Sequence, residues 1–275
     1  MNYKNNTMAL SLFFTCLMTF LATSMNANAG EGVATFIEKS RVTLDVTYAS
    51  KYIGQRGVDY FGNGSAIQPS MNIDLSDTGL YMGIWGATSP EKGCTDPFGD
   101  KCEDWVEYDF YAGHSATLLE GSPFKTTYDI SYVYMYYPKQ AKEDLHLVGL
   151  KFTHADLLPK LGPSKPSLYW GVSYIWTAER RGRDRKEFLL GLGYDVPVAT
   201  QNINIFVDGV WDTGPGGSVN KNGLTRVRTG ASTKFSWEGF DFKPAIYYQS
   251  KTKTTVPKSW IESEFWFKFS VSYSF

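Results

Sequence analysis

Apolar and polar residues alternate along most of this chain, and the last eleven residues show the pattern most clearly. Every odd position from 265 to 275 is aromatic or valine, whereas the even positions hold Trp266, Lys268 and three serines. A period of two residues is typical of a β-strand with one apolar and one polar face. Eleven residues is also the length of a tilted strand that crosses a bilayer. We therefore predict a membrane-crossing strand that ends at Phe275.

The same alternation predicts about eleven further strands, which makes about twelve in all. The segments 80–87 and 145–154 alternate less cleanly, and their apolar faces are ambiguous. The predicted strands lie near residues 41–48, 67–75, 80–87, 106–113, 127–136, 145–154, 168–176, 188–196, 203–211, 227–235, 242–248 and 265–275.

The predicted connections alternate between short turns and longer segments rich in charge or glycine. The turns lie near 76–79, 117–123, 156–165, 197–202 and 236–239, and the longer loops near 50–65, 88–103, 137–143, 178–187, 212–224 and 250–258. Tyr and Trp gather at the strand ends, as in the aromatic girdle of a membrane barrel. This organisation predicts an all-β protein: a transmembrane antiparallel β-barrel with short periplasmic turns and longer extracellular loops. A soluble β-sandwich is the alternative, but its terminal strand would expose an aromatic edge to water.

Composition supports the barrel and excludes two other classes of protein. The chain has 275 residues, of which 43% are hydrophobic, 16% aromatic and 20% charged. A formal net charge of −1 is too close to neutral for a nucleic-acid-binding protein. After Gly30 no apolar run is long enough for a transmembrane helix.

Residues 1–29 have the features of a secretory signal peptide. Lys4 is followed by a mostly apolar stretch, and Ala27-Asn28-Ala29 has the small-residue pattern of a cleavage site. A membrane anchor is the alternative, but the apolar run is short for one. Residues 30–275 would then form the barrel, in the outer membrane of a Gram-negative bacterium.

Cys94 and Cys102 enclose a short segment rich in turn-forming residues. In an exported protein we expect them to form a disulfide. A metal site is the alternative, but no histidine lies nearby and two sulfurs do not complete a zinc site.

If the apolar faces contact lipid, the opposite faces line the barrel interior. The candidates for pore-lining residues are Asp45, Glu107, Asp109, Asp129, Asp208, Asp212, Arg226, Arg228, Lys234 and Lys268. We also expect Tyr111 and Trp266 to fill part of a narrow interior. Strand pairing is expected to bring Asp212 near Arg226 and Lys234 near Asp241. These charges either create a transverse field that selects solutes or form cross-strand ion pairs that satisfy a wet interior. We favour the ion pairs.

No pattern in the sequence indicates catalysis, a metal or a cofactor. The histidines are His114, His146 and His154. His114 and Ser115 are neighbours in a strand and so point to opposite faces, which excludes a direct hydrogen bond between their side chains. His146 and His154 share a face with Val148, Leu150 and Phe152, the face expected to contact lipid. We predict that the protein is not an enzyme.

Several segments also resemble a known family, the TorF-type porins of proteobacteria. The resemblance lies in Tyr48–Gly57, Ala66–Gln68 and Thr78–Gly86, and further on in Glu107–Gly113 and Tyr136–Pro138. It covers about residues 42–212. Lys51, Arg56 and Pro69 depart from the family pattern. The resemblance implies an outer-membrane channel of unassigned substrate.

The function that the sequence favours is a channel for passive diffusion of small hydrophilic solutes. A plugged structural or adhesive barrel that acts through its surface loops is the main alternative, and an outer-membrane hydrolase is a weaker one. The expected partners are outer-membrane lipid, the solutes, and the barrel-assembly machinery, which would recognise the terminal strand and Phe275.

The signal-peptide prediction can be tested on the protein isolated from membranes. N-terminal sequencing should begin at Gly30, because export removes the segment before the small-residue site. A chain that retains its first 29 residues would instead support the membrane anchor.

Overall fold

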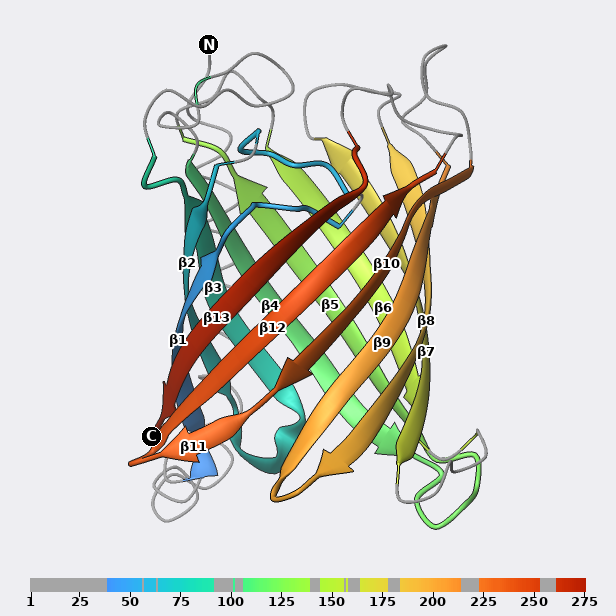
Figure 1. The fold of residues 1–275 in the computed structure, drawn as a ribbon. Coiled ribbons are helices and arrows are strands. Elements are labelled where there is room, and N and C mark those ends of the chain that lie inside the picture. Colours follow the sequence, from blue (N-terminus) through green and yellow to red (C-terminus); the bar gives the residue numbers. More distant parts are fainter. Residues whose placement is uncertain are drawn as a thin grey trace, which may run out of the picture.

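The computed structural model describes residues 39–55, 57–62, 64–91, 101, 106–138, 144–155, 157, 164–177, 184–213, 223–252 and 261–275. These residues form an almost purely β structure (Figure 1). The strands are β1 (Arg41–Ala49), β2 (Ala66–Asp74), β3 (Leu80–Thr88), β4 (Val106–Leu118), β5 (Thr126–Tyr136), β6 (Leu145–His154), β7 (Lys165–Thr177), β8 (Arg185–Val198), β9 (Gln201–Asp212), β10 (Gly223–Thr233), β11 (Phe235–Trp237), β12 (Phe240–Lys251) and β13 (Glu264–Ser274), with one short 3-10 helix, η1 (Ser76–Thr78).

The strands form a closed antiparallel barrel. Strands that are neighbours in the chain pair with each other, except that β10 and β11 both pair with β12, and β1 pairs with β13 over residues Thr43 to Ala49. Closure leaves no strand edge exposed, which is the condition for a sheet within a membrane. No helix among the described residues is long and apolar enough to cross a membrane.

β10 and β11 together form one wall strand, so the barrel has twelve strands. Ser232 of β10 pairs with Ala245 of β12, and Phe235 of β11 pairs with Phe242 of the same strand. The two pairs have the same register, and only Lys234 separates the two strands. The predicted fold class and strand number are confirmed.

The outer surface of the barrel is apolar, as the alternation predicts. Exposed side chains include Val46, Ile130, Val172, Val207 and Ile246, each on the predicted outward face of a different strand. Between them, polar side chains point inward, because successive residues of a strand face opposite sides. Soluble monomers rarely expose so continuous an apolar surface to water, whereas the lipid-facing band of a membrane barrel is apolar.

The structure decides the faces of the two segments whose alternation is ambiguous. In β3 the aromatic residues Tyr81 and Trp85 point inward, where Tyr81 donates a hydrogen bond to Asp129. Tyr111 also points inward, as predicted, and its ring lies against Gly83 on the neighbouring strand. A Cβ on Gly83 would lie 2.3 Å from the Tyr111 hydroxyl, so only glycine permits this contact. In β6 the outward face carries His146, whose ring stacks on Trp176.

The connections also follow the predicted alternation. We call the end of the barrel with short connections, such as 199–200 and 238–239, the turn end. The other end, which includes segments 50–65 and 252–263, is the loop end. In Figure 1 the C-terminus marks the turn end.

A pair of substitutions in β5 tests the assignment of faces. Ile130 is 45% exposed at the middle of the strand, and Ser131 is its inward-facing neighbour. Ile130→Lys should reduce the free energy of unfolding in lipid vesicles by about 2–4 kcal/mol, because lysine then faces the bilayer centre. Ser131→Lys should cost much less, since its ammonium group faces a polar interior. Equal losses for the two variants, measured by denaturant titration, would contradict the assignment.

Candidate functional site

The first connection at the loop end folds into the barrel as a small hairpin. Ile53 and Asp59 form an isolated antiparallel bridge, and Tyr60 donates its amide hydrogen to the carbonyl of Tyr52 at 2.9 Å. Gly57 forms the tip, where its φ of 87° lies in the region that favours glycine. We call residues 52–55 and 57–60 the inner hairpin.

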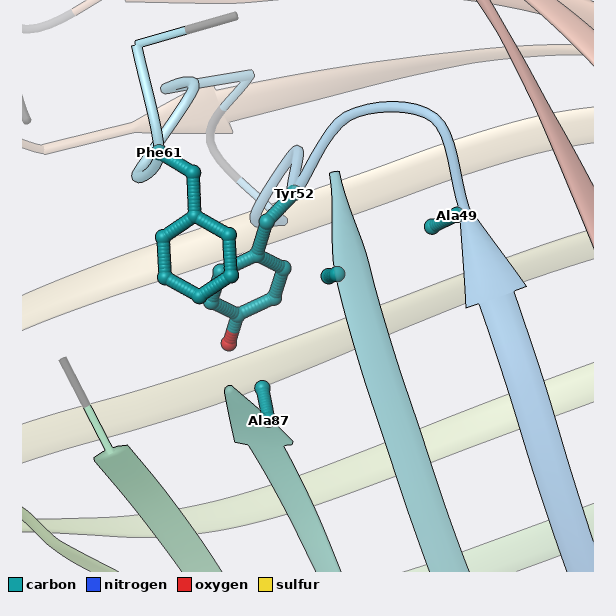
Figure 2. Packing of buried hydrophobic residues seen from close by; sticks show 5 residues of the cluster. Ala49, Tyr52, Phe61 and Ala87 are labelled. Atoms are coloured by element: carbon teal, nitrogen blue, oxygen red, sulfur yellow. The ribbon is translucent and has the colours of Figure 1, made fainter. Parts of the chain in front are cut away.

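Apolar side chains attach the inner hairpin and the residue that follows it to one side of the barrel wall. Tyr52 and Phe61 are buried together with Ala49, Ala66 and Ala87 at the ends of β1, β2 and β3 (Figure 2). The Tyr52 and Phe61 ring centroids are 5.0 Å apart. Burial of a phenylalanine side chain contributes about 1.5–3 kcal/mol. This contact therefore favours the inward position of the segment over an extended surface loop.

Hydrogen bonds to a buried carboxylate strengthen the same attachment. Glu107 of β4 accepts one from the Tyr52 hydroxyl and one from Tyr137 at 3.0 Å. Burial, followed by the nearby Glu107 charge, raises the pKa of Tyr52 and Tyr137 well above the ordinary 10.0. Both phenols thus remain protonated donors at neutral pH. Their stabilising contribution is complete below pH 10 and is lost only in strong alkali, because the unfolded tyrosines ionise first.

Polar contacts join the tip of the inner hairpin to two further strands of the wall, β10 and β12. Arg226 of β10 donates a hydrogen bond to the carbonyl of Gln55. Gln249 of β12 donates one to the carbonyl of Gly57 at 2.8 Å. The hairpin is therefore held by β1–β4 on one side and by β10 and β12 on the other, and it narrows the passage at the loop end.

Lys51, just before the hairpin, adds an ion pair. Its ammonium nitrogen lies 2.5 Å from Glu264 of β13 and 4.0 Å from Asp59. Lys51 is a position where the chain departs from the TorF-type pattern, and here the lysine contributes to anchoring the segment.

Arg226 is held in turn by a buried carboxylate. Asp208 of β9 lies 2.8 Å from Arg226 Nη1 and 2.6 Å from Arg228 Nη2. Phe206 and Tyr247 lie beside the Arg228 guanidinium, with centroids 5.2 and 5.7 Å away. One carboxylate thus positions two arginines, and one of these positions the hairpin.

The hairpin of β9 and β10 explains why Asp208 receives both arginines. We expected this hairpin to bring Asp212 near Arg226. Gly223 is the direct partner of Asp212, and an irregularity between Leu224 and Arg226 places Val210, two residues before Asp212, opposite Arg226. The shift places Asp208 opposite Arg228. Alternation identifies the inward face but does not reveal an inserted residue.

All ten predicted lining residues belong to the inward face of the wall. Lys234 reaches Asp241 at 3.0 Å, which confirms that expectation. Asp45 accepts a hydrogen bond from Thr47 at 2.9 Å, and Asp129 accepts one from Tyr81 at 2.8 Å. The structure does not gather the ten into one cluster. Asp208, Arg226 and Arg228 lie together, Glu107 lies across the interior, and Lys234 lies toward the turn end.

Between the inner hairpin and the turn end, the interior of the barrel contains a cavity of about 510 Å³. Its lining runs from Trp85, which packs against the apolar cluster of the hairpin, to Asn202 beside the turn between β8 and β9. Other lining residues come from β1, β2, β10, β12 and β13. A polar space therefore continues from the constriction to the turn end.

A family model described as a bacterial protein of unknown function (Gcw_chp) matches residues 35–259. The chain belongs to the Gcw_chp family. This match does not confirm the TorF-type name. No curated protein matches the chain.

Solved structures similar to this Gcw_chp protein are outer-membrane barrels. The structure titled KdgM porin has a TM-score of 0.51 and 7% identity over 85% of this chain and 99% of its own. The structure titled NanC porin has a TM-score of 0.52 and 8% identity over 84% and 98%. An outer-membrane channel from Pseudomonas putida F1 has a TM-score of 0.51 and 10% identity over 86% and 96%. At these identities the likeness shows the fold alone.

Sequence reasoning missed the inner hairpin of this Gcw_chp protein. The signal was present, because segment 50–65 carries Tyr52, Ile53, Val58, Tyr60 and Phe61, too many apolar residues for a solvated loop. It also missed two inward-facing residues, Gln249 and the buried Glu187. The predicted disulfide of Cys94 and Cys102 and the signal peptide lie outside the described residues.

The position of the inner hairpin can be tested with two glycine substitutions. A Cβ on Gly57 would lie 2.8 Å from Gln249 Oε1 and 2.9 Å from Arg226 Cδ, whereas a Cβ on Gly121 would meet nothing within 4 Å. Both glycines have positive φ, so Gly121→Ala is a control for backbone strain. Gly57→Ala should increase hydrogen exchange across residues 52–60, and Gly121→Ala should not. Equal exchange in the two variants would show that the hairpin does not depend on this contact.

Proposed function

We propose that this protein is an outer-membrane channel for passive diffusion of small hydrophilic solutes. The observation that carries the proposal is a closed barrel with a polar interior cavity, narrowed at the loop end by the inner hairpin. Charged side chains in the interior would destabilise the folded barrel if they were removed from water, so we expect water to fill this space. A twelve-strand wall with an inserted segment favours a narrow channel over a wide pore. The ten predicted lining residues would contact the solute path.

The same features support a location in the outer membrane. An apolar outer face with aromatic strand ends fits lipid, and residues 1–29 would direct export. The barrel-assembly machinery would recognise the terminal strand ending at Phe275. The fold shared with outer-membrane porins and channels supports this proposal.

The positions of the three histidines argue against a hydrolase. His114 is hydrogen-bonded to Tyr128, His146 to Tyr132 and His154 to Thr126, all on the outward face. None of the three lines the interior cavity. Within the described residues, no group of His, Cys, Asp or Glu could hold a metal ion.

Single-channel recording in planar bilayers tests the proposal. Discrete ohmic steps should be seen for the refolded chain from Gly30 to Phe275. Because Ala49 and Ala66 are cross-strand partners, a short Asn-Gly turn can replace residues 50–65 without a change of register. This variant should conduct several-fold more than wild type, since the constriction is removed.

A second shortened variant is a matched control. Leu118 and Thr126 are also partners, so residues 119–125 at the turn end can be replaced in the same way. Conductance should then stay near the wild-type value. A barrel that folds and inserts but carries no current, with or without segment 50–65, would overturn the channel and support a plugged barrel acting through its surface loops.

A further inference from the structure

The interior cavity is basic on one side. Lys234, Lys243 and Lys268 all line it. Lys234 lies between β10 and β11, Lys243 is on β12 and Lys268 is on β13. The register that joins Ser232 to Ala245 and Phe235 to Phe242 places Lys234 opposite Lys243. Lys268 is opposite Ala245, one diagonal step from Lys243. Like charges this close are unfavourable unless an anion or water lies between them.

Two carboxylates near these three lysines, Asp241 and Asp195, neutralise only part of their charge. Asp241 is the ion-pair partner of Lys234 and also accepts a hydrogen bond from Ser236. Among the described residues, no ion pair joins Lys243 or Lys268 to a carboxylate. Asp195 also lines the cavity, and it accepts a hydrogen bond from Asn204 at 2.7 Å. The cavity therefore carries an excess of positive charge.

A buried amide in the same cavity points to a ligand that also carries hydroxyl groups. Gln68 of β2 is 3% exposed, and its Nε2 has no hydrogen-bond partner within the described part of the chain. An unsatisfied buried donor costs roughly 1–3 kcal/mol, so its persistence calls for an acceptor that binds there. The pairing of β2 with β3 is interrupted at this point. Neither Gln68 nor Pro69 has a cross-strand partner on β3, and Pro69 has no amide hydrogen to donate.

The remaining lining residues fit a sugar ring. Asn202, Asn204 and Ser270 present amide and hydroxyl groups, and Trp85 and Tyr247 present aromatic rings. Pockets of roughly 300–1,000 Å³ suit small molecules, and this one measures about 510 Å³. A bare inorganic ion would use the lysines but leave the amides and rings without a role.

We propose that this cavity binds an anionic monosaccharide, with Lys243 and Lys268 on its acidic group and Gln68 on a hydroxyl oxygen. The acidic group is a carboxylate or a phosphate, since a lysine ammonium binds either as a point charge. The proposal deepens the proposed function by naming a solute class. Passage of the sugar through the membrane depends on the proposed channel function, whereas binding of the sugar in the cavity does not.

Binding is measured first, without a membrane potential. The folded protein in detergent micelles is titrated with D-glucuronate, D-glucose 6-phosphate and uncharged D-glucose by isothermal calorimetry. Both anions should bind more tightly than glucose, and more weakly as salt is raised. A preference between the two anions would identify the acidic group.

Three variants assign the roles. Lys243→Gln and Lys268→Gln should each weaken binding of the anions about tenfold or more, the loss expected for a charge-assisted hydrogen bond. Gln68→Leu should weaken binding of glucose as well as of the anions. Lys125→Gln is the matched control, because Lys125 is an exposed lysine in the turn that follows β4.

Reversal potentials and solute block in planar bilayers complete the test. The reversal potential of the wild-type channel should show a preference for anions over cations. D-glucuronate should reduce the current. Both effects should be smaller in Lys268→Gln. Equal affinity for glucuronate and glucose, or unchanged affinity in both lysine variants, would overturn the site while leaving a conducting channel intact. Binding without current would leave the site standing and overturn the channel.

Discussion

Pairing of β1 with β13 is the constraint on which the other features depend. Backbone amides and carbonyls within a bilayer have no water to bind, so the sheet must close on itself. The closing ladder runs from Thr43 with Ser274 to Ala49 with Lys268. It places Thr47 against Ser270, whose hydroxyl groups lie 2.6 Å apart inside the barrel. Closure thereby creates both the apolar outer surface and an enclosed interior in which every polar side chain needs a partner or water.

The inner hairpin is a consequence of that enclosure. Ala49 and Ala66 are paired, so the segment between them leaves and re-enters the wall at adjacent points. Its aromatic residues find an apolar surface only on the inner side of the mouth, against Ala87 and Trp85. Once the segment lies inside, its backbone carbonyls need donors, and Arg226 of β10 and Gln249 of β12 supply them. Apolar burial thus selects the inward position, and polar contacts hold its tip.

Charge inside the barrel is distributed unevenly. Near the loop end, Asp208 neutralises part of the charge on two arginines, and Glu107 is satisfied by tyrosine hydroxyls. These contacts are structural, which agrees with the preference for ion pairs over a selective field. In the cavity, Lys243 and Lys268 have no such ion-pair partners among the described residues. The part of the interior that stabilises the constriction is therefore distinct from the part that is suited to a solute.

Much of this architecture could be predicted from residue order. Alternation alone places Ile246 in lipid and Lys268 inside, because in a strand the side-chain period is two whatever the neighbours are. The strand number, the two kinds of connection and the contact between Lys234 and Asp241 follow from the same periodicity and from turn positions. Three features could not be obtained this way. The irregular pairing before Arg226 places two arginines against Asp208, the segment after β1 turns inward, and Gln68 lines the same cavity as two lysines from the far end of the sequence. Each depends on register or on contacts across the interior, and these exist only once the sheet has closed.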